Sequence, residues 1–306
     1  TLVLDRRDST DYGPNEGGGN ALYPEALCDL KPGVDFLVGT LGYDGVVILG
    51  HSKGTSFAPV YPSYFRNCGT DVADSPASND PRVVAVVTMG TQADNREAAQ
   101  AAPFAGPSFE EELFPGLACG PTLYGCNLVV AGQEVAAGRG DQLYEFFAGI
   151  LLGNGSLLSA SIPLTPDSLL SFFGTDTLAV VEREALKLDV PYLIVHADGD
   201  SVTPPQWSDR LYATLSLAGK DVTYFTPPYQ SLYPNGNVRD PNRGQPAHSL
   251  NAEQARKEFA ASLYAWLAGK IPAAAQDATG INNAAIQALP EFGPALLPPA
   301  PDPALP

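Results

Sequence analysis

A serine between two glycines, in Gly50-His51-Ser52-Lys53-Gly54, provides the residue types of a nucleophilic turn. The pentapeptide follows the apolar run 46–49 directly and leads into a stretch, 55–60, that can begin a helix. Because glycine lacks a Cβ, the backbone can turn tightly and hold the Ser52 hydroxyl at the tip of the turn. N–H groups at the start of a following helix would face any negative charge that develops there. An ordinary Gly/Ser turn also fits the pattern, and the preceding β-branched run is what favours a nucleophile.

A serine nucleophile needs a base, and the chain has three histidines. His51 neighbours Ser52 inside the turn, where its side chain should point away from the working side of the hydroxyl. His196 ends an expected buried strand, which favours a core or supporting position. His248 lies in a loop between the last expected strand and the last helix, where an imidazole can reach over the sheet edge. We therefore predict that His248 is the base.

A carboxylate must orient that histidine and stabilise its imidazolium form. Asp198 and Asp200 both lie in the polar loop that follows the expected strand 190–196. Asp200 is preferred because it lies deeper in the loop, whereas Asp198 is better placed to stabilise the turn; the alternative is that both are solvated turn aspartates. A calcium site that adds Asp209 lacks the spacing of an EF-hand loop. We expect neither a metal nor another cofactor.

The apolar runs around these residues predict a mostly parallel sheet that is buried on both faces. We expect its strands at 46–49, 82–89, 190–196 and 222–225, and a further short strand at 2–4. Helical spacing is found at 23–30 and 34–41, with a kink or break at Pro32, and at 204–217, where Gly219 ends the helix. Asn251 and Gln254 form a capping box for the last helix, whose apolar face should pack on the sheet.

The stretch 90–188 has a different character, with apolar stripes at helical spacing and short polar breaks. It predicts an insertion made of helices at 109–113, 143–152, 169–173 and 178–188. Thr165-Pro166-Asp167 is typical of a helix start, and Gly174 of a helix end. Beyond residue 270 the chain is rich in alanine and proline, which predicts an extended tail or linker over 271–306.

Charge and cysteine content narrow the functional classes. The 306-residue chain has a formal net charge of −17, which repels phosphate backbones and anionic lipids, so we expect no nucleic-acid partner. No apolar run approaches the roughly 20 residues needed to span a bilayer.

Cys119 and Cys126 bracket a short loop that favours a local disulfide, which leaves Cys28 and Cys68 as the second candidate pair. These disulfides would indicate a secreted or periplasmic protein, and four buried free thiols in a cytosolic protein are the alternative.

The strand, G-x-S-x-G turn and helix, the chain order Ser52, Asp200, His248 and the helical insertion together resemble the α/β-hydrolase superfamily, of the lidded serine esterase and lipase type. The resemblance covers about residues 1–270. It implies an α/β core from 1–90 and 189–270, a helical lid from 91–188 and a tail from 271–306. It also implies that Ser52 attacks an acyl carbonyl, that His248 acts as base and then acid, that Asp200 orients His248, and that the backbone N–H of Lys53 donates to the oxyanion. Aromatic residues of the lid are candidates for the pocket or the lid core: Phe146, Phe147, Phe172 and Phe173.

One departure from the family pattern concerns the first strands. Asp5-Arg6-Arg7-Asp8-Ser9 resembles the end of the strand that comes just before the nucleophile strand. The strand that normally ends in the His-Gly oxyanion loop is therefore expected to be missing from this chain. Either a separate N-terminal segment that completes the sheet is an expected partner, or the second oxyanion donor comes from an unusual place. Loss of one oxyanion donor typically costs about 100- to 1,000-fold in rate.

The resulting expectation is a secreted serine hydrolase that cleaves a small-molecule or lipid-like carboxylic ester through an acyl-enzyme. A peptidase or amidase of the same fold would have the same triad and a different pocket. A second alternative is a non-catalytic binding or interaction protein that keeps the fold but has lost the oxyanion loop. Thr1 as an N-terminal nucleophile would need a four-layer fold, which the expected strand order does not suggest.

Overall fold

The computed structural model describes residues 21–69, 79–91, 123–151, 157–197, 200, 203, 205–226 and 256–271. Several predicted features lie outside these residues: the strand at 2–4, the helix at 109–113, the capping box at Asn251 and the tail. Asp198, His248 and Cys119 also lie outside them.

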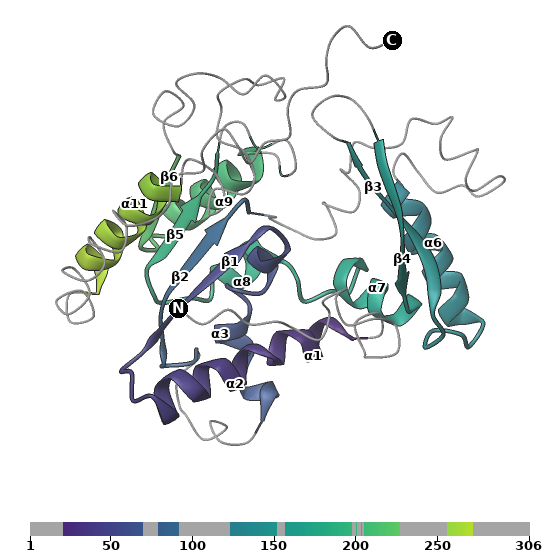
Figure 1. Ribbon diagram of the computed structural model, residues 1–306, viewed down its shortest axis with the longest axis horizontal. Coiled ribbons are helices and arrows are strands. Elements are labelled where there is room, and N and C mark those ends of the chain that lie inside the picture. Colours follow the sequence, from purple (N-terminus) through teal and green to yellow (C-terminus); the bar gives the residue numbers. More distant parts are fainter. Residues whose placement is uncertain are drawn as a thin grey trace, which may run out of the picture.

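Four parallel strands form the central sheet, in the order β1-β2-β5-β6. They are β1 (Val46–His51), β2 (Val83–Met89), β5 (Tyr192–Val195) and β6 (Val222–Phe225). His51 pairs with Met89, and Met89 pairs with Val195, so the carboxyl ends of three strands meet at one edge (Figure 1). Among the described strands, β1 pairs on one side only. The predicted fold class, a mostly parallel sheet flanked by helices, is confirmed.

Successive side chains of each strand point to opposite faces of the sheet, as strand geometry requires. On β5, Tyr192 and Ile194 join one core cluster, whereas Leu193 and Val195 join the other. Helices α1 (Tyr23–Cys28), α2 (Leu30–Asp35), α8 (Val181–Ala185) and α9 (Pro205–Leu217) contribute to the first cluster. Helix α11 (Arg256–Lys270) covers the other face through Phe259, Leu263 and Trp266, as predicted for the last helix. Both faces of the sheet are therefore covered, which explains its continuous apolar strands.

The insertion contains a β-hairpin where a helix was predicted. Strand β3 (Tyr144–Leu151) pairs antiparallel with β4 (Leu157–Leu164) in a separate two-stranded sheet. The predicted helix at 143–152 is therefore wrong: aromatic and β-branched residues favour the extended ladder, and Gly149 disfavours a helix interior. Helix α6 (Leu123–Ala136) lies beside the hairpin in Figure 1. Helix α7 (Pro166–Phe173) follows, and its start is capped as predicted, because the Thr165 hydroxyl accepts a hydrogen bond from the Ser168 N–H.

The segment after α7 packs into the first core cluster through Ala179, Val181, Ala185 and Leu188. The helix predicted over 178–188 is shorter, since only α8 (Val181–Ala185) is helical. The Thr177 hydroxyl accepts a hydrogen bond from the Ala179 N–H, which holds a turn before the helix. The division of the chain into core, lid and tail remains a prediction.

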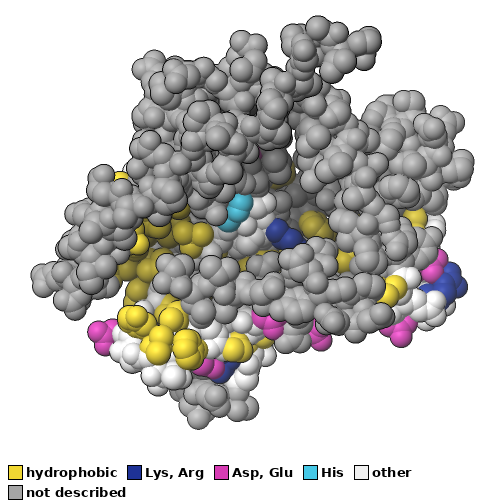
Figure 2. All heavy atoms as spheres, viewed as in Figure 1, with side chains coloured by type: hydrophobic (Ala, Val, Ile, Leu, Met, Phe, Trp, Pro, Cys, Tyr) yellow, Lys and Arg dark blue, Asp and Glu magenta, His cyan; other side chains and the backbone are white. Residues whose placement is uncertain are grey.

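Near the amino end, Pro32 lies in the first turn of α2 and does not break it. A proline is tolerated there because the first N–H groups of a helix have no partner within it. A π-helical turn, η1 (Phe36–Thr40), follows α2. On the face shown in Figure 2, hydrophobic side chains gather near this end of the chain, and Phe36, Leu41 and Tyr43 are exposed.

An ion pair between the partly exposed Arg82 and the buried Asp80 anchors the start of β2. The Arg82 guanidinium donates two hydrogen bonds to Asp80, of 2.9 and 2.7 Å, and a third to Asp35 on α2. The Tyr61 hydroxyl donates to the same Asp80 carboxylate at 3.0 Å, and burial together with the Asp80 charge raises the pKa of Tyr61. Burial alone would raise the pKa of Asp35, but the hydrogen bonds and charges of Lys31 and Arg82 hold it below its ordinary value. These contacts join α2, α3 (Tyr61–Tyr64) and β2.

A disulfide joins Cys28, at the end of α1, to Cys68, at the end of the 3₁₀ turn η3 (Phe65–Cys68). The bridge closes a loop with a sequence separation of 40 residues, which includes β1 and the serine turn. The proposed partner of Cys126, Cys119, lies outside the described residues.

Candidate active site

The serine turn is strained at its central residue. Strand β1 ends at His51, and a 3₁₀ helix, η2 (Ser52–Ser56), begins at the next residue. Ser52 has a φ of +53°, and no other described residue except glycine has a positive φ. This left-handed conformation costs an ordinary L-residue about 1–2 kcal/mol. The turn therefore presents Ser52 at the carboxyl end of a buried strand in a conformation that the surrounding structure must impose.

The two glycines of the turn have different roles. A Cβ built on Gly50 would lie 2.2 Å from the carbonyl oxygen of Gly54 and 2.9 Å from the Thr55 nitrogen. Both of these are backbone atoms, so the clash cannot be relieved by rotating a side chain. A Cβ on Gly54 would meet nothing within 4 Å. Only the first glycine is therefore required by the close approach of the backbone, although the sequence pattern treats both alike.

Hydrogen bonds hold the turn after Ser52. The Thr55 hydroxyl donates to the Ser52 carbonyl at 2.6 Å, and the Ser56 hydroxyl donates to the Lys53 carbonyl at 2.8 Å. The stretch 55–60, which was expected to begin a helix, does not continue as one helix, because η2 ends at Ser56 and α3 begins only at Tyr61. Pro59 explains the gap: it lacks an N–H and disfavours a helical conformation at the residue before it.

Lys53 connects the turn to the insertion. Its Nζ lies 4.2 Å from the centroid of the Phe172 ring, within the range of a cation–π interaction. Phe172 itself is buried against the rings of Tyr23 and Phe57, with centroid distances of 5.2 and 6.0 Å. Phe172 is thus a core residue. Its contact with the Lys53 side chain links the serine turn to helix α7.

Asp200 lies just beyond β5, at the same edge of the sheet as Ser52, and its side chain is buried. Its Oδ1 accepts a hydrogen bond from the Thr203 N–H at 2.8 Å, and its Oδ2 accepts one from the Thr203 hydroxyl at 3.2 Å. The Nε2 atom of His196 lies 3.2 Å from the same Oδ2. The Asp200 side chain is 1% exposed, so the alternative of a solvated turn aspartate does not hold for this residue.

His196 occupies a buried supporting position, in agreement with the sequence analysis. Its Nδ1 lies 2.6 Å from the Ser208 hydroxyl on α9, and its Nε2 lies 3.0 Å from the Thr203 carbonyl oxygen. Sequence reasoning did not identify Thr203 and Ser208 as its partners. A threonine three residues after Asp200 fits a side-chain turn motif, but Ser208 carries no such signal because it lies inside a helix.

The structure brings Ser52 and Asp200 to one sheet edge, at the ends of β1 and β5, with β2 between these strands. The proposed base, His248, lies outside the described residues, and so the triad remains a prediction. Phe146 and Phe147 lie on β3, and their side chains are also outside the description.

Two further features of the described part of the chain concern metal sites and helices that could span a membrane. There, no group of three or more His, Cys, Asp or Glu residues is placed to hold a metal ion. None of the helices described here is both long enough and apolar enough to cross a membrane.

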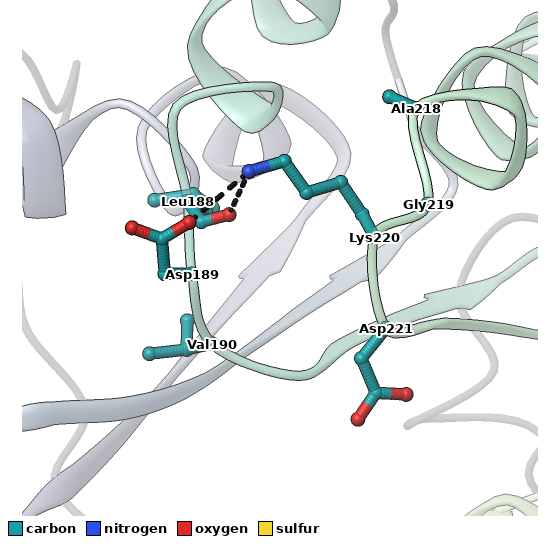
Figure 3. Close-up of a pocket in the computed structure, with 7 residues that line it drawn as sticks. All are labelled: Leu188, Asp189, Val190, Ala218, Gly219, Lys220 and Asp221. Atoms are coloured by element: carbon teal, nitrogen blue, oxygen red, sulfur yellow. Dashed lines mark hydrogen bonds and ion pairs between the residues drawn. The ribbon is translucent and has the colours of Figure 1, made fainter.

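A pocket of about 250 Å³ lies at the opposite edge of the sheet (Figure 3). It is lined by residues that precede β5 and β6, including Asp189, Lys220 and Asp221. The Lys220 ammonium donates to the Leu188 carbonyl at 2.8 Å and pairs with Asp189 at 3.2 Å, which ties the two loops together. Because parallel strands begin at this edge and end at the other, the pocket is separate from Ser52.

No protein-family model matches the chain, and no curated protein matches it. Solved structures that match include a carboxyl esterase from Bacillus coagulans, with 14% identity and a TM-score of 0.47, over 84% of this chain and 76% of that chain. A monoglyceride lipase variant from Saccharomyces cerevisiae matches with 14% identity and a TM-score of 0.46, over 86% and 75%. An esterase domain from Rhodothermus marinus matches with 16% identity and a TM-score of 0.42, over 78% and 67%. We base the fold class on the parallel sheet and the helices that cover it, and we draw no conclusion about activity from these matches.

Proposed function

We propose that the protein is a serine hydrolase of the α/β-hydrolase type that cleaves carboxylic esters through an acyl-enzyme on Ser52. The observation that carries the proposal is the left-handed backbone of Ser52 at the carboxyl edge of a buried parallel sheet. Backbone strain of this kind persists only where neighbouring structure over-determines it, and it clusters at functional sites. Here the close contact between Gly50 and the Gly54 carbonyl provides that constraint.

In the proposed reaction, the Ser52 hydroxyl attacks the ester carbonyl while His248 takes its proton. The backbone N–H of Lys53 donates a hydrogen bond to the negative charge that develops on the carbonyl oxygen. His248 then gives the proton to the leaving alcohol. In the second half of the reaction, a water molecule attacks the acyl-enzyme while His248 takes its proton, and His248 returns that proton to the Ser52 oxygen as the acid leaves. Asp200 holds the His248 ring in orientation and stabilises its charged form. The buried, multiply hydrogen-bonded Asp200 carboxylate supports this role.

The substrate is proposed to be a small-molecule or lipid-like ester, with the insertion as a lid over the acyl site. The contact between Lys53 and Phe172 supports a lid, because it joins the insertion directly to the serine turn. A further N-terminal segment is proposed to pair with β1 and to supply the second oxyanion donor. Among the described strands, β1 pairs on one side only, which supports an additional strand at its other edge. The disulfide between Cys28 and Cys68 supports a secreted or periplasmic location.

The test is to map the adduct formed with a fluorophosphonate by mass spectrometry, with Ser52→Ala as the control. A chain-length series of nitrophenyl esters and a panel of aminoacyl amides are assayed alongside. Labelling of Ser52 together with ester turnover supports the proposal. Faster turnover of amides would assign a peptidase or amidase instead. Labelling of another residue refutes the assignment of Ser52, and a lack of any reaction in a chain with its native N-terminus would favour a non-catalytic binding protein.

A further inference from the structure

The proposed reaction leaves a buried histidine without a role. The side chain of His196 is fully buried, and that of Asp200 is 1% exposed. A buried imidazole loses its hydration, so it must be compensated by hydrogen bonds at both ring nitrogens. Both nitrogens of His196 have close polar neighbours, which come from the loop after β5 and from α9.

The identity of these neighbours determines which nitrogen carries a hydrogen. Nε2 faces the Thr203 carbonyl oxygen at 3.0 Å and Asp200 Oδ2 at 3.2 Å. A carbonyl and a carboxylate are both acceptors, so Nε2 must be the donor. Nδ1 faces the hydroxyl of Ser208 at 2.6 Å, and a hydroxyl can donate to it. A hydrogen on Nε2 therefore satisfies every contact: the two acceptors at Nε2 require it, and the Ser208 hydroxyl can donate to Nδ1.

The same contacts connect Asp200 to a rigid element. Ser208 is fully buried in the first half of α9, a helix of 13 residues that packs in the first core cluster through Leu211 and Leu215. The chain of contacts thus runs from α9 through the His196 ring to Asp200 Oδ2, while Thr203 holds Oδ1. A carboxylate has about four acceptor sites, so the two hydrogen bonds from Thr203 and the contact with His196 Nε2 do not by themselves prevent a further hydrogen bond to a catalytic histidine.

We propose that His196 and Ser208 are positioning residues, which fix the direction of the Asp200 carboxylate through the Nε2–H of His196. This inference rests on the proposed function, because it gives Asp200 the task of orienting the base. His196 does not contact the substrate. It sets the orientation of the Asp200 carboxylate, which in turn orients His248. A misplacement of about 1 Å in such a carboxylate can cost about 100-fold in rate.

The experiment compares four variants by kcat and KM on a nitrophenyl ester and by thermal unfolding. His196→Phe keeps the ring and removes the donor, and kcat should fall about 100-fold with KM changed by less than about twofold. Ser208→Ala removes the hydrogen-bond partner of His196 Nδ1, which connects the ring to α9, and kcat should fall about 10-fold. His196→Gln retains an N–H donor near the Nε2 position and should restore activity to within about fivefold of the wild type. Ser168→Ala is the matched control, since it also removes a buried serine hydroxyl, one that donates to the Ala21 carbonyl at 2.7 Å.

A double-mutant cycle with Asp200→Asn separates positioning from a merely structural role. If His196 acts through Asp200, adding His196→Phe to Asp200→Asn costs little further activity, because the effects of residues that act as a unit are not additive. Additive losses, or a failure of His196→Gln to restore activity, would overturn the inference. The proposed function fails by a different outcome: Ser52 does not react with a fluorophosphonate, or Asp200→Asn retains wild-type kcat/KM. Should His196→Phe not fold, the cycle is completed with Ser208→Ala.

Discussion

Exchanging the two glycines of the serine turn for alanine, one at a time, should give opposite results. In Gly50→Ala the new Cβ lies 2.2 Å from the Gly54 carbonyl oxygen, and such contacts essentially never fall below 3.0 Å. The turn must therefore open by about 0.8 Å or more between backbone atoms that flank Ser52. We expect a loss of about 1–3 kcal/mol in the free energy of unfolding, as for other overpacked sites. A displacement of this size should also lower kcat on a nitrophenyl ester by about 100-fold.

Gly54→Ala makes the same chemical change four residues later, where a Cβ meets nothing within 4 Å. Its activity should stay within about threefold of the wild type, and its unfolding free energy within about 0.5 kcal/mol. Urea unfolding and the rate of fluorophosphonate labelling at Ser52 measure both effects. Equal behaviour of the two variants, or wild-type labelling in Gly50→Ala, would show that the turn is not held by this backbone contact.

Three further predictions concern stability. Replacing Cys28 and Cys68 with serine opens a loop spanning 40 residues and should cost about 4 kcal/mol in unfolding free energy; reductant should then destabilise the wild type but not this variant in urea unfolding. Arg82→Met leaves the buried Asp80 carboxylate without its ion-pair partner, and urea unfolding should show a loss of about 3–5 kcal/mol; a loss below about 1 kcal/mol would contradict this. The pKa of Asp35 is lowered in the folded protein, so its contribution is complete above the ordinary carboxyl pKa of about 4 and is lost as the pH falls through the lowered value. Asp35→Asn should therefore reduce the acid-induced loss of stability in unfolding measured between pH 6 and pH 2, and an unchanged pH dependence would assign that loss to other groups.

The central sheet could be predicted from the sequence because its strands are continuous apolar runs with sharp ends. The run at 222–225 matches β6 at both ends, and the helix expected from 204 to 217 is found as α9 (Pro205–Leu217). The stop at Gly219 is confirmed by a φ of +70°, which glycine adopts without strain. Local signals of this kind need no knowledge of distant contacts.

The hairpin β3–β4 could not be predicted in the same way. Neither strand shows a regular alternation of apolar and polar residues, so helical spacing also fits the sequence, and pairing with a segment further along the chain decides in favour of strands. At the candidate site, the position of Asp200 after a strand was visible in the sequence. The contact between His196 and Ser208 was not, because it depends on how α9 packs against the end of β5.

The bridge between Cys28 and Cys68 encloses Ser52 within a covalent ring, together with the strand that carries it. A cut in the backbone anywhere inside this ring would leave both fragments attached to each other. Protease nicking close to Ser52 would therefore not release the segment on either side of it. Under oxidising conditions such a nicked molecule would still migrate as one species, and it would separate into two only after reduction.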